Sequence, residues 1–204
     1  MEAQATSALP PEFLRTVSRD EINELPIRRY EGEVLVVETP KDLDRAWEDL
    51  AQESMVGWDT ETRPAFRKGE VHLPCLVQAA TARAVYLFQL PKMDFSGVVG
   101  GLFAEPSIVK AGISVADDLR QLRLVIPFEE SSVLDLGKAA HRHGLKQSGL
   151  RNLAGIFLGF RVPKGTKTSN WAAPRLSPQQ VNYAATDAWT CRELYLRFEA
   201  LGML

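Results

Sequence analysis

The sequence predicts a single α/β domain in which a mixed β-sheet is flanked by α-helices. Strand-like segments come first, strands then alternate with helical segments, and helices follow toward the end of the chain, an order typical of this architecture. The length of 204 residues suits one domain, and 45% hydrophobic with 25% charged residues is the composition of a chain that buries a core. The sequence contains no internal repeat and no low-complexity segment.

The first 30 residues differ from the rest of the chain. Residues 1–30 are polar, contain three prolines and show no sustained hydrophobic period. We therefore expect an N-terminal extension that is at most partly ordered, followed by one domain spanning residues 31–204.

From residue 33 onward, the segments are expected to alternate in type. Residues 39–52 predict a helix, because Thr39 is a favourable N-cap and Pro40 suits the first helical position. A short helix is expected near residues 97–103, and mostly helical structure after residue 113. Apolar segments of strand length predict five strands, at residues 33–38, 55–61, 75–81, 84–90 and 107–113. The third and fourth of these strands are expected to continue the sheet in antiparallel orientation.

Cysteine usage and hydropathy indicate the compartment. Cys75 and Cys191 lie far apart and outside any Cys-x-x-Cys pattern, which argues against a disulfide scaffold or a zinc site and for a reducing environment. The N-terminus has no apolar segment of signal-peptide length, and no segment approaches the roughly 18 apolar residues that span a bilayer. We expect a soluble, intracellular, cytoplasmic protein with no membrane partner.

Charge is distributed unevenly along the chain. The net charge is −2, yet no acidic residue occurs between Asp135 and Asp187. Such separation suits binding to a phosphate backbone, although surface cations can also cluster by chance. The acid-free interval contains two histidines (His141, His143) and eight cationic residues, Lys138, Arg142, Lys146, Arg151, Arg161, Lys164, Lys167 and Arg175.

Two acidic residues stand one residue apart in a segment that otherwise looks like a core strand. In MVGWDTET, Asp59 and Glu61 point to the same face of the expected strand, about 7 Å apart, because side chains alternate between the two faces. Two like charges on one face of a core strand need a compensating charge.

A third acidic residue follows the strand at 107–113. Ser114 and Asp117 have the spacing of a capping box, which predicts a helix start. On a helical wheel, Asp117 faces away from the apolar stripe, whereas Asp118 lies at its edge and faces the sheet. Asp118 is therefore the candidate for chemistry, and Asp117 is expected to be a solvated residue of the first turn. The apolar stripe consists of Val115, Leu119, Leu122 and Ile126.

The last helix places a fourth acidic residue in an apolar stripe. Asp187 interrupts the series Ala184, Cys191, Leu194 and Phe198, and Tyr183 lies one turn before it on that side. An ionised carboxylate in a buried stripe costs several kcal/mol, unless it is paired or binds a cation. We therefore expect a positive partner for Asp187.

These acidic segments together resemble a known family. DTE at 59–61, KAGISVADDLRQL at 110–122 and YAATD at 183–187 are similar to the three motifs of the DEDD superfamily of 3′-5′ exonucleases, in the subfamily whose third motif carries a tyrosine. The likeness covers about residue 33 to the C-terminus, and three motifs in the right order are specific. Ser114 departs from the pattern, because relatives often have asparagine, glycine or histidine there.

Within that superfamily, the chain most resembles the Werner-syndrome-type exonuclease domain, and ribonuclease D is slightly more distant. The resemblance implies a ribonuclease H-like fold. The segments that carry the closer likeness are RPAFRKG at 63–69, SNW at 169–171 and LSPQQVNYAATDA at 176–188.

The resemblance also implies a set of catalytic residues. Asp59, Glu61, Asp118 and Asp187 would hold two divalent cations, for which oxygen ligands favour Mg²⁺ or Mn²⁺. Asp59 would bridge the ions, Glu61 and Asp187 would bind the ion that carries the nucleophilic water, and Asp118 would belong to the second ion. Tyr183 would position that water, because a phenol with a pKa near 10 stays protonated at neutral pH. The reaction would release nucleoside 5′-monophosphates from a free 3′ end of DNA or RNA.

Five further residues are candidates for substrate binding. Thr60 neighbours the acidic residues in the strand but alternates away from them, and Arg63 follows in a loop that could approach phosphates or simply be solvated. Lys164 and Lys167 lie in a basic loop that could guide a strand. Trp171 could stack on a base or anchor that loop.

The alternative function is a catalytically restricted module on the same fold, which binds nucleic acid or acts only within a complex. The intact acidic residues and the tyrosine argue against it. Protein partners cannot be named from the sequence.

Overall fold

The computed structural model describes residues 9–65, 67, 69–164 and 169–204. In this part of the chain, one mixed sheet has the strand order β1-β4-β3-β2-β5-β6. Strand β3 is antiparallel to β2 and β4, and the other neighbouring pairs are parallel. The predicted mixed sheet and its antiparallel middle are therefore confirmed. The strands are β1 (Glu33–Val36), β2 (Met55–Thr62), β3 (Pro74–Ala80), β4 (Ala84–Gln89), β5 (Val109–Gly112) and β6 (Val133–Asp135).

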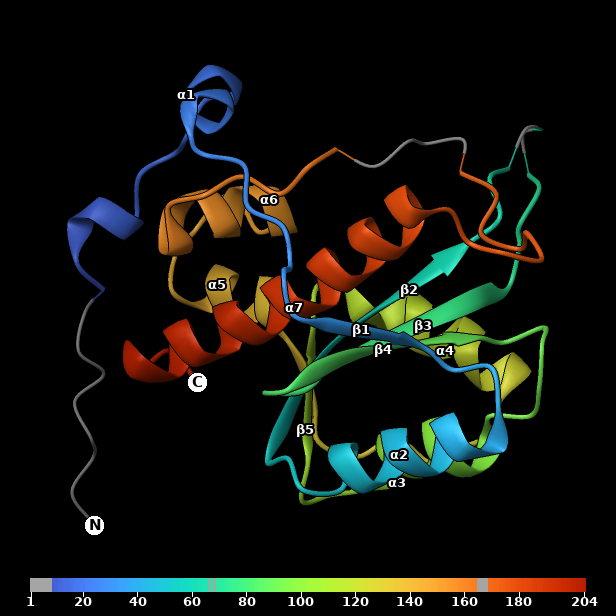
Figure 1. Cartoon of the computed structure of the whole chain (residues 1–204). Helices are drawn as coiled ribbons and strands as arrows, with labels where there is room; N and C mark the ends of the chain where they lie inside the picture. Colours follow the sequence, from blue (N-terminus) through green and yellow to red (C-terminus); the bar gives the residue numbers. More distant parts are fainter. Residues whose placement is uncertain (1–8, 66, 68, 165–168) are drawn as a thin grey trace, which may run out of the picture.

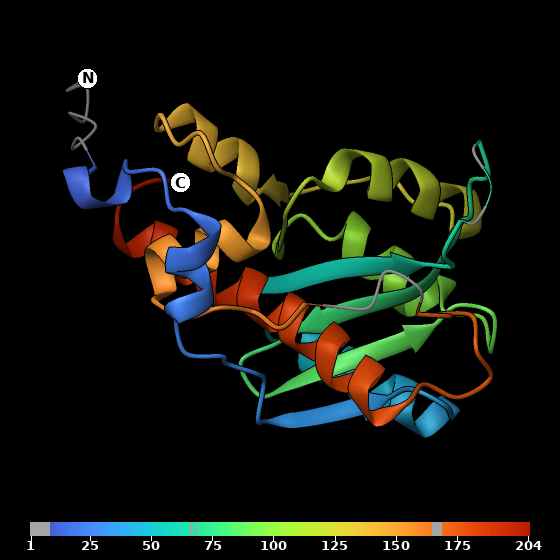
Figure 2. The ribbon, with the colours of Figure 1, turned by 90° about the horizontal axis from the view of Figure 1, so that it is seen from above.

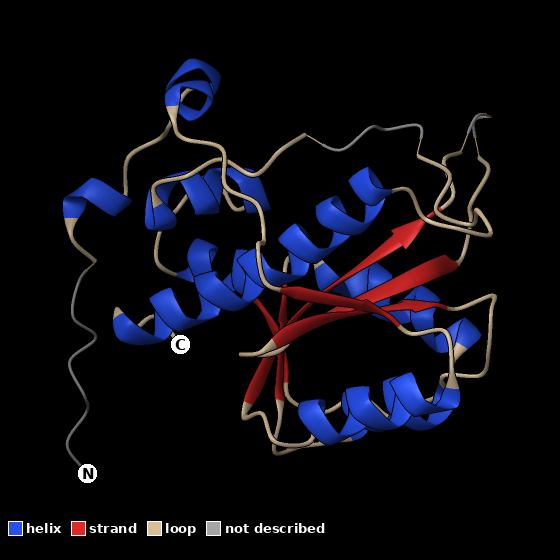
Figure 3. Cartoon of the chain, in the orientation of Figure 1, coloured by secondary structure: helices blue, strands red, loops and turns tan. Residues whose placement is uncertain are grey.

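Helices surround the sheet (Figure 3). Thr39 caps α2 as predicted, in a capping box with Asp42, and Pro40 is the first helical residue. No helix in the described residues is long and apolar enough to cross a membrane. The α-helices are α1 (Arg19–Glu24), α2 (Pro40–Leu50), α3 (Gly101–Ala104), α4 (Val115–Val125), α5 (Leu136–Arg142), α6 (Leu150–Leu153) and α7 (Pro178–Ala200). A 3-10 helix is η1 (Pro11–Phe13), and π-helices are η2 (Ser96–Gly100) and η3 (Ala154–Leu158).

The two faces of the sheet are covered by different helices. Helices α2, α3 and α4 pack on one face, where the ring of Trp58 meets Phe103 edge-on with centroids 4.7 Å apart. Helix α7 crosses the opposite face (Figures 1 and 2). The predicted apolar stripe of α7 is buried throughout, including Asp187. The sheet is therefore enclosed by apolar contacts on both sides.

Helix α7 lies unusually close to β2. A Cβ atom added to Gly57 would stand 2.2 Å from the carbonyl oxygen of Ala188 and 2.4 Å from the backbone nitrogen of Arg192. Only glycine permits this approach, because the two backbones almost touch. The small side chains of Ala184 and Ala185 continue the contact against β3 and β4.

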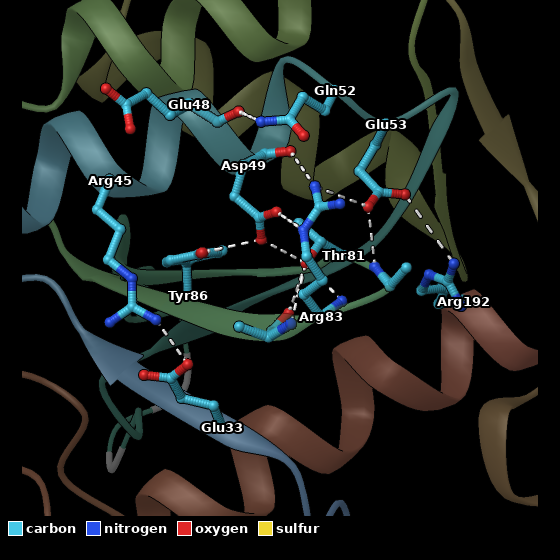
Figure 4. Close-up of polar contacts among 12 residues, drawn as sticks. Glu33, Arg45, Glu48, Asp49, Gln52, Glu53, Thr81, Arg83, Tyr86 and Arg192 are labelled. Atoms are coloured by element: carbon cyan, nitrogen blue, oxygen red, sulfur yellow. Dashed lines mark hydrogen bonds and ion pairs between the residues drawn. The ribbon is translucent and has the colours of Figure 1, made fainter.

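A polar network fixes the end of α2 to the sheet and to α7 (Figure 4). Asp49 accepts a hydrogen bond of 2.8 Å from the hydroxyl of Tyr86 and is paired with Arg83. Glu53 lies 3.5 Å from Arg83 and 4.0 Å from Arg192 of α7. These contacts come from three separate segments, so they constrain where α7 crosses the sheet.

One prediction from the sequence is wrong. Ser114 does not cap α4, because it adopts a left-handed backbone (φ 59°), from which its side chain makes no capping bond; an N-cap normally has an extended backbone. The chain after residue 113 is mostly helical, as predicted, but it also contains a strand that was not expected. β6 pairs with β5, and the described part of residues 159–177 contains no helix. A three-residue strand is too short to show an alternating pattern.

We predict that Gly57→Ala destabilises the protein by roughly 1–3 kcal/mol, because the added methyl group forces α7 away from β2. Urea unfolding followed by circular dichroism measures this change. Gly97→Ala is the matched control, since a Cβ there meets nothing within 4 Å. Equal stability of the two variants would contradict the close contact.

Candidate active site

Asp59 and Glu61 lie on the face of β2 that α7 covers. Gly57 faces α7, and side chains alternate along a strand, so residues 59 and 61 point the same way as Gly57. Both carboxylates are half-buried. Trp58, which precedes Asp59, is buried in the core on the other face.

Asp118 reaches the same end of β2 from α4. β5 pairs only with residues 55–57 of β2, so the remainder of β2 has no strand on that side, and the first turn of α4 stands beside it. The hydroxyl of Thr60 donates a hydrogen bond of 2.9 Å to Asp118 Oδ1. Asp117 is exposed and pairs with Arg120, which confirms the helical wheel. Thr60 is only 8% exposed, so its side chain holds Asp118 in position.

Asp187 and Tyr183 come from α7. The helix starts with a capping box between Ser177 and Gln180, and Pro178 is its first residue. Asp187 is 4% exposed, and its Oδ1 atom is buried with no hydrogen-bond partner among the described residues. A buried carboxylate oxygen without a donor is the expected state of a cation ligand.

The four carboxylates affect one another. Burial, followed by the charges of Asp187 and Asp118, raises the pKa of Glu61 to about 8. Burial also raises the pKa of Asp187 to about 7, and burial together with Asp187 and Glu61 raises the pKa of Asp59 well above its usual range. The upward direction is the one that burial and neighbouring negative charges both produce.

Tyr183 keeps its proton in this environment. Burial, and then the negative charge of Asp187, raise the pKa of the phenol above its ordinary value. The hydroxyl is therefore a donor at neutral pH, which suits a positioning role.

The donor set fits a hard divalent cation. Carboxylate oxygens are the ligands that Mg²⁺ and Mn²⁺ prefer, and the unpartnered oxygen of Asp187 needs a positive neighbour. As the side chains stand, no group of three or more Asp, Glu, His or Cys residues in the described chain is close enough to hold one ion. A bound cation would offset the repulsion between these like charges.

Three cavities meet at Tyr183. One of about 510 Å³ is lined by Glu61 and Asp118, and another of about 750 Å³ by Asp59 and Asp187. The third, of about 590 Å³, extends along the start of α7. Tyr183 lines all three. The carboxylates are therefore reached from open space on two sides of this tyrosine.

The predicted substrate-binding residues surround these cavities. Arg63 is exposed beside Glu61 and Asp118, and Lys164 is exposed at the two other cavities. Trp171 is only 6% exposed, with its ring centroid 6.0 Å from that of Tyr183, so its burial favours the anchoring role. Lys167 lies outside the described residues.

Two cationic residues of the cavity beside Asp59 and Asp187 were not among the predicted site residues. Arg151 lines it from α6, and Arg19 lines it from α1. Arg151 belongs to the acid-free interval, so its charge was a usable signal. The sequence carried no such signal for Arg19, because its contact with the cavity depends on how the N-terminal extension folds back.

Comparison with known proteins supports the family. A model of the family described as 3′-5′ exonuclease matches residues 34–201. The chain is 26% identical over 195 residues to the exonuclease mut-7 homolog of Aedes aegypti, covering 83% of this chain and 27% of that protein. It is 30% identical over 168 residues to ribonuclease D of Acidiphilium cryptum (strain JF-5), covering 80% of this chain and 42% of that protein. The chain thus spans less than half the length of both relatives.

The fold has a matching neighbour among solved structures. The crystal structure of the Aedes aegypti Nibbler EXO domain superposes with a TM-score of 0.73 at 24% identity, covering 85% of this chain and 90% of that chain. This likeness confirms the ribonuclease H-like architecture. Because the family match extends over most of the sequence, the chain belongs to the metal-dependent 3′-5′ exonuclease family, as its resemblance to the DEDD superfamily predicted.

Proposed function

We propose that the protein hydrolyses the terminal phosphodiester at a free 3′ end of DNA or RNA, with two divalent cations, Mg²⁺ or Mn²⁺, and releases nucleoside 5′-monophosphates. The observation that carries this proposal is the buried, unpartnered Oδ1 of Asp187 beside the carboxylates of two other segments. A cluster of this kind is unfavourable by itself and becomes favourable around cations.

Each acidic residue has a proposed role. Asp59 bridges the two ions, Glu61 and Asp187 bind the ion next to the attacking water, and Asp118 binds the other. When bound, such an ion pair stabilises both the attacking and the departing oxygen of the phosphate. Tyr183 donates its hydrogen bond to orient the water. These roles follow the family motifs and agree with the side of β2 from which each residue comes.

Supporting residues position this set and the substrate. Thr60 orients Asp118 through its hydroxyl. Arg63 and Lys164, with Lys167, are proposed to bind phosphates of the strand, and Trp171 supports Tyr183 from behind. Cations around a carboxylate site draw a polyanion toward it.

We also propose that residues 31–204 form the nuclease domain, preceded by an extension, and that the protein works in a reducing compartment such as the cytoplasm. Cys75 and Cys191 are both free thiols, as expected there. Cell fractionation tests the compartment, and recovery in a secreted fraction would contradict it.

An oligonucleotide assay tests the activity. Purified protein is incubated with 5′-labelled single-stranded DNA and RNA, in Mg²⁺, in Mn²⁺ and in EDTA. A ladder that shortens from the 3′ end only with metal supports the proposal. Binding without cleavage would favour a restricted nucleic-acid-binding module instead.

Asp118→Asn should lower kcat by at least about 100-fold, because it removes a cation ligand while keeping the shape of the side chain. The control is Asp117→Asn on the adjacent, exposed position, for which we expect less than a twofold change. Both variants should melt at the wild-type temperature or above it. Equal losses of kcat would show that the two aspartates do not have separate roles.

Without metal, the free energy of unfolding should fall as the pH rises from about 4 to about 8. In the folded protein, the carboxyl groups of Glu61 and Asp187 have pKa values of about 8 and about 7, so they keep their protons over much of this range. In the unfolded chain, the same carboxyl groups lose their protons near the ordinary pKa of about 4. The folded state therefore binds more protons, and stability decreases with pH. Urea titrations in EDTA at several pH values measure this slope.

Variants and metal provide the controls for this pH dependence. Asp187→Asn should flatten the slope, whereas Asp117→Asn should keep it. Mn²⁺ added at pH 8 should restore stability to the wild type, because it binds only the folded site. A wild-type slope that is already flat in EDTA would mean that these carboxylates do not interact.

A further inference from the structure

The N-terminal extension is fixed to the nuclease domain on both sides of α1. Val17 and Gln147 exchange two hydrogen bonds, of 2.8 Å from the Val17 amide and of 2.9 Å to its carbonyl. After α1, the Arg161 amide donates to the carbonyl of Pro26 at 2.9 Å, and the Arg28 amide donates to the carbonyl of Arg161 at 3.2 Å. Helix α1 is therefore held between two anchors.

The inner face of α1 presses on the helical segment formed by α6 and η3, above which it stands in Figure 1. Ile22 is 4% exposed, and a Cβ added to Gly155 would lie 2.3 Å from its Cδ1 atom. This contact leaves no room for α1 to shift inward. The orientation of its remaining faces is thus defined.

The side of α1 that carries Ile22 also borders the cavity that contains catalytic carboxylates. Arg19 and Asn23, four residues apart and so on one side of the helix, line the cavity of about 750 Å³ together with Asp59, Tyr183 and Asp187. Both α1 residues precede residue 34, where the match to the exonuclease family begins. The N-terminal extension therefore lines one side of a cavity whose other residues lie in the region that matches the exonuclease family.

The charged residue that α1 contributes to the cavity lining is the cation Arg19. Within the described chain, Arg19 makes no ion pair, whereas Arg15 of the same extension pairs with Glu21. Arg151 lines the cavity from α6, and its Nε atom is buried without a partner there. Among the described lining residues, the only acidic ones are the metal-binding candidates Asp59 and Asp187. The acidic residues of α1 (Asp20, Glu21, Glu24) do not line it.

We propose that Arg19 binds a backbone phosphate of the nucleic-acid strand upstream of the bond that is cut, so that the N-terminal extension forms part of the substrate channel. This inference rests on the proposed function, because it assumes that the 3′ end lies at the carboxylates. The guanidinium is exposed and makes no ion pair within the described residues, and its planar group of donors suits a phosphate contact.

Two substrates and three variants test the proposal. The substrates are a single-stranded octanucleotide and a dinucleotide with a 5′ hydroxyl, which has the scissile phosphate and none upstream. The variants are Arg19→Ala, Arg19→Lys and the control Arg28→Ala, an exposed arginine of the same extension outside this cavity. Steady-state kinetics are measured in Mg²⁺ or Mn²⁺ at several salt concentrations, and melting temperatures verify folding.

We expect Arg19→Ala to raise KM for the octanucleotide by roughly threefold to fivefold at unchanged kcat. The slope of log KM against log salt should fall by about 0.7, the value for one phosphate contact on a single strand. The dinucleotide should be cleaved like wild type, Arg19→Lys should recover most of the loss, and Arg28→Ala should behave as wild type. An unchanged octanucleotide KM, or equal losses on both substrates, would overturn the proposal.

Binding without turnover separates this inference from the proposed function. Fluorescence anisotropy with a labelled octanucleotide in EDTA gives Kd for each variant without cleavage. If the wild type binds but never cleaves, the proposed function fails. In that case, weaker binding by Arg19→Ala, with wild-type binding by Arg28→Ala, still supports the channel. If Arg19→Ala and wild type have the same Kd, or neither binds, the channel is overturned.

Discussion

The contact between α7 and β2 at Gly57 is the constraint on which the site depends. The backbone of α7 touches the strand at Ala188, next to Asp187, while Asp59 lies two residues beyond Gly57 along β2. The two carboxylates are thus brought together by backbone packing, not by any attraction between them. The free energy for this arrangement comes from the buried alanines and strand residues beneath α7 and from the polar network around Asp49, far from the carboxylates themselves.

Burial of Asp187 follows from the same contact and gives the site its chemical character. An apolar residue at this position would suit the stripe better, since a buried carboxylate is costly and its replacement by an apolar group is often neutral or stabilising. The unpartnered oxygen therefore represents stability given up for the ability to bind a cation, a common cost at functional sites. Tyr183 lies one turn before Asp187 on α7 and donates a hydrogen bond to its carboxylate, whereas Thr60 of β2 orients Asp118.

The sequence predicted those features that depend on local periodicity. Alternation along β2 placed Asp59 and Glu61 on one face, the helical wheel separated Asp118 from Asp117, and the stripe of α7 identified Asp187, because each pattern repeats over several residues. Features set by contacts between distant segments were missed. β6 forms because β5 is beside it, Ser114 turns left-handed because the chain passes from strand to helix within two residues, and Arg19 reaches the cavity only because the extension folds back over the later part of the chain.

The link between Val17 and Gln147 also has a consequence for how the protein is made. These partners are 130 residues apart, so the segment around Val17 has nothing to dock on until Gln147 has been synthesised. Asp187 is synthesised later than either partner. The acidic centre and its cationic border therefore both depend on long-range loop closure, which is slow compared with local folding.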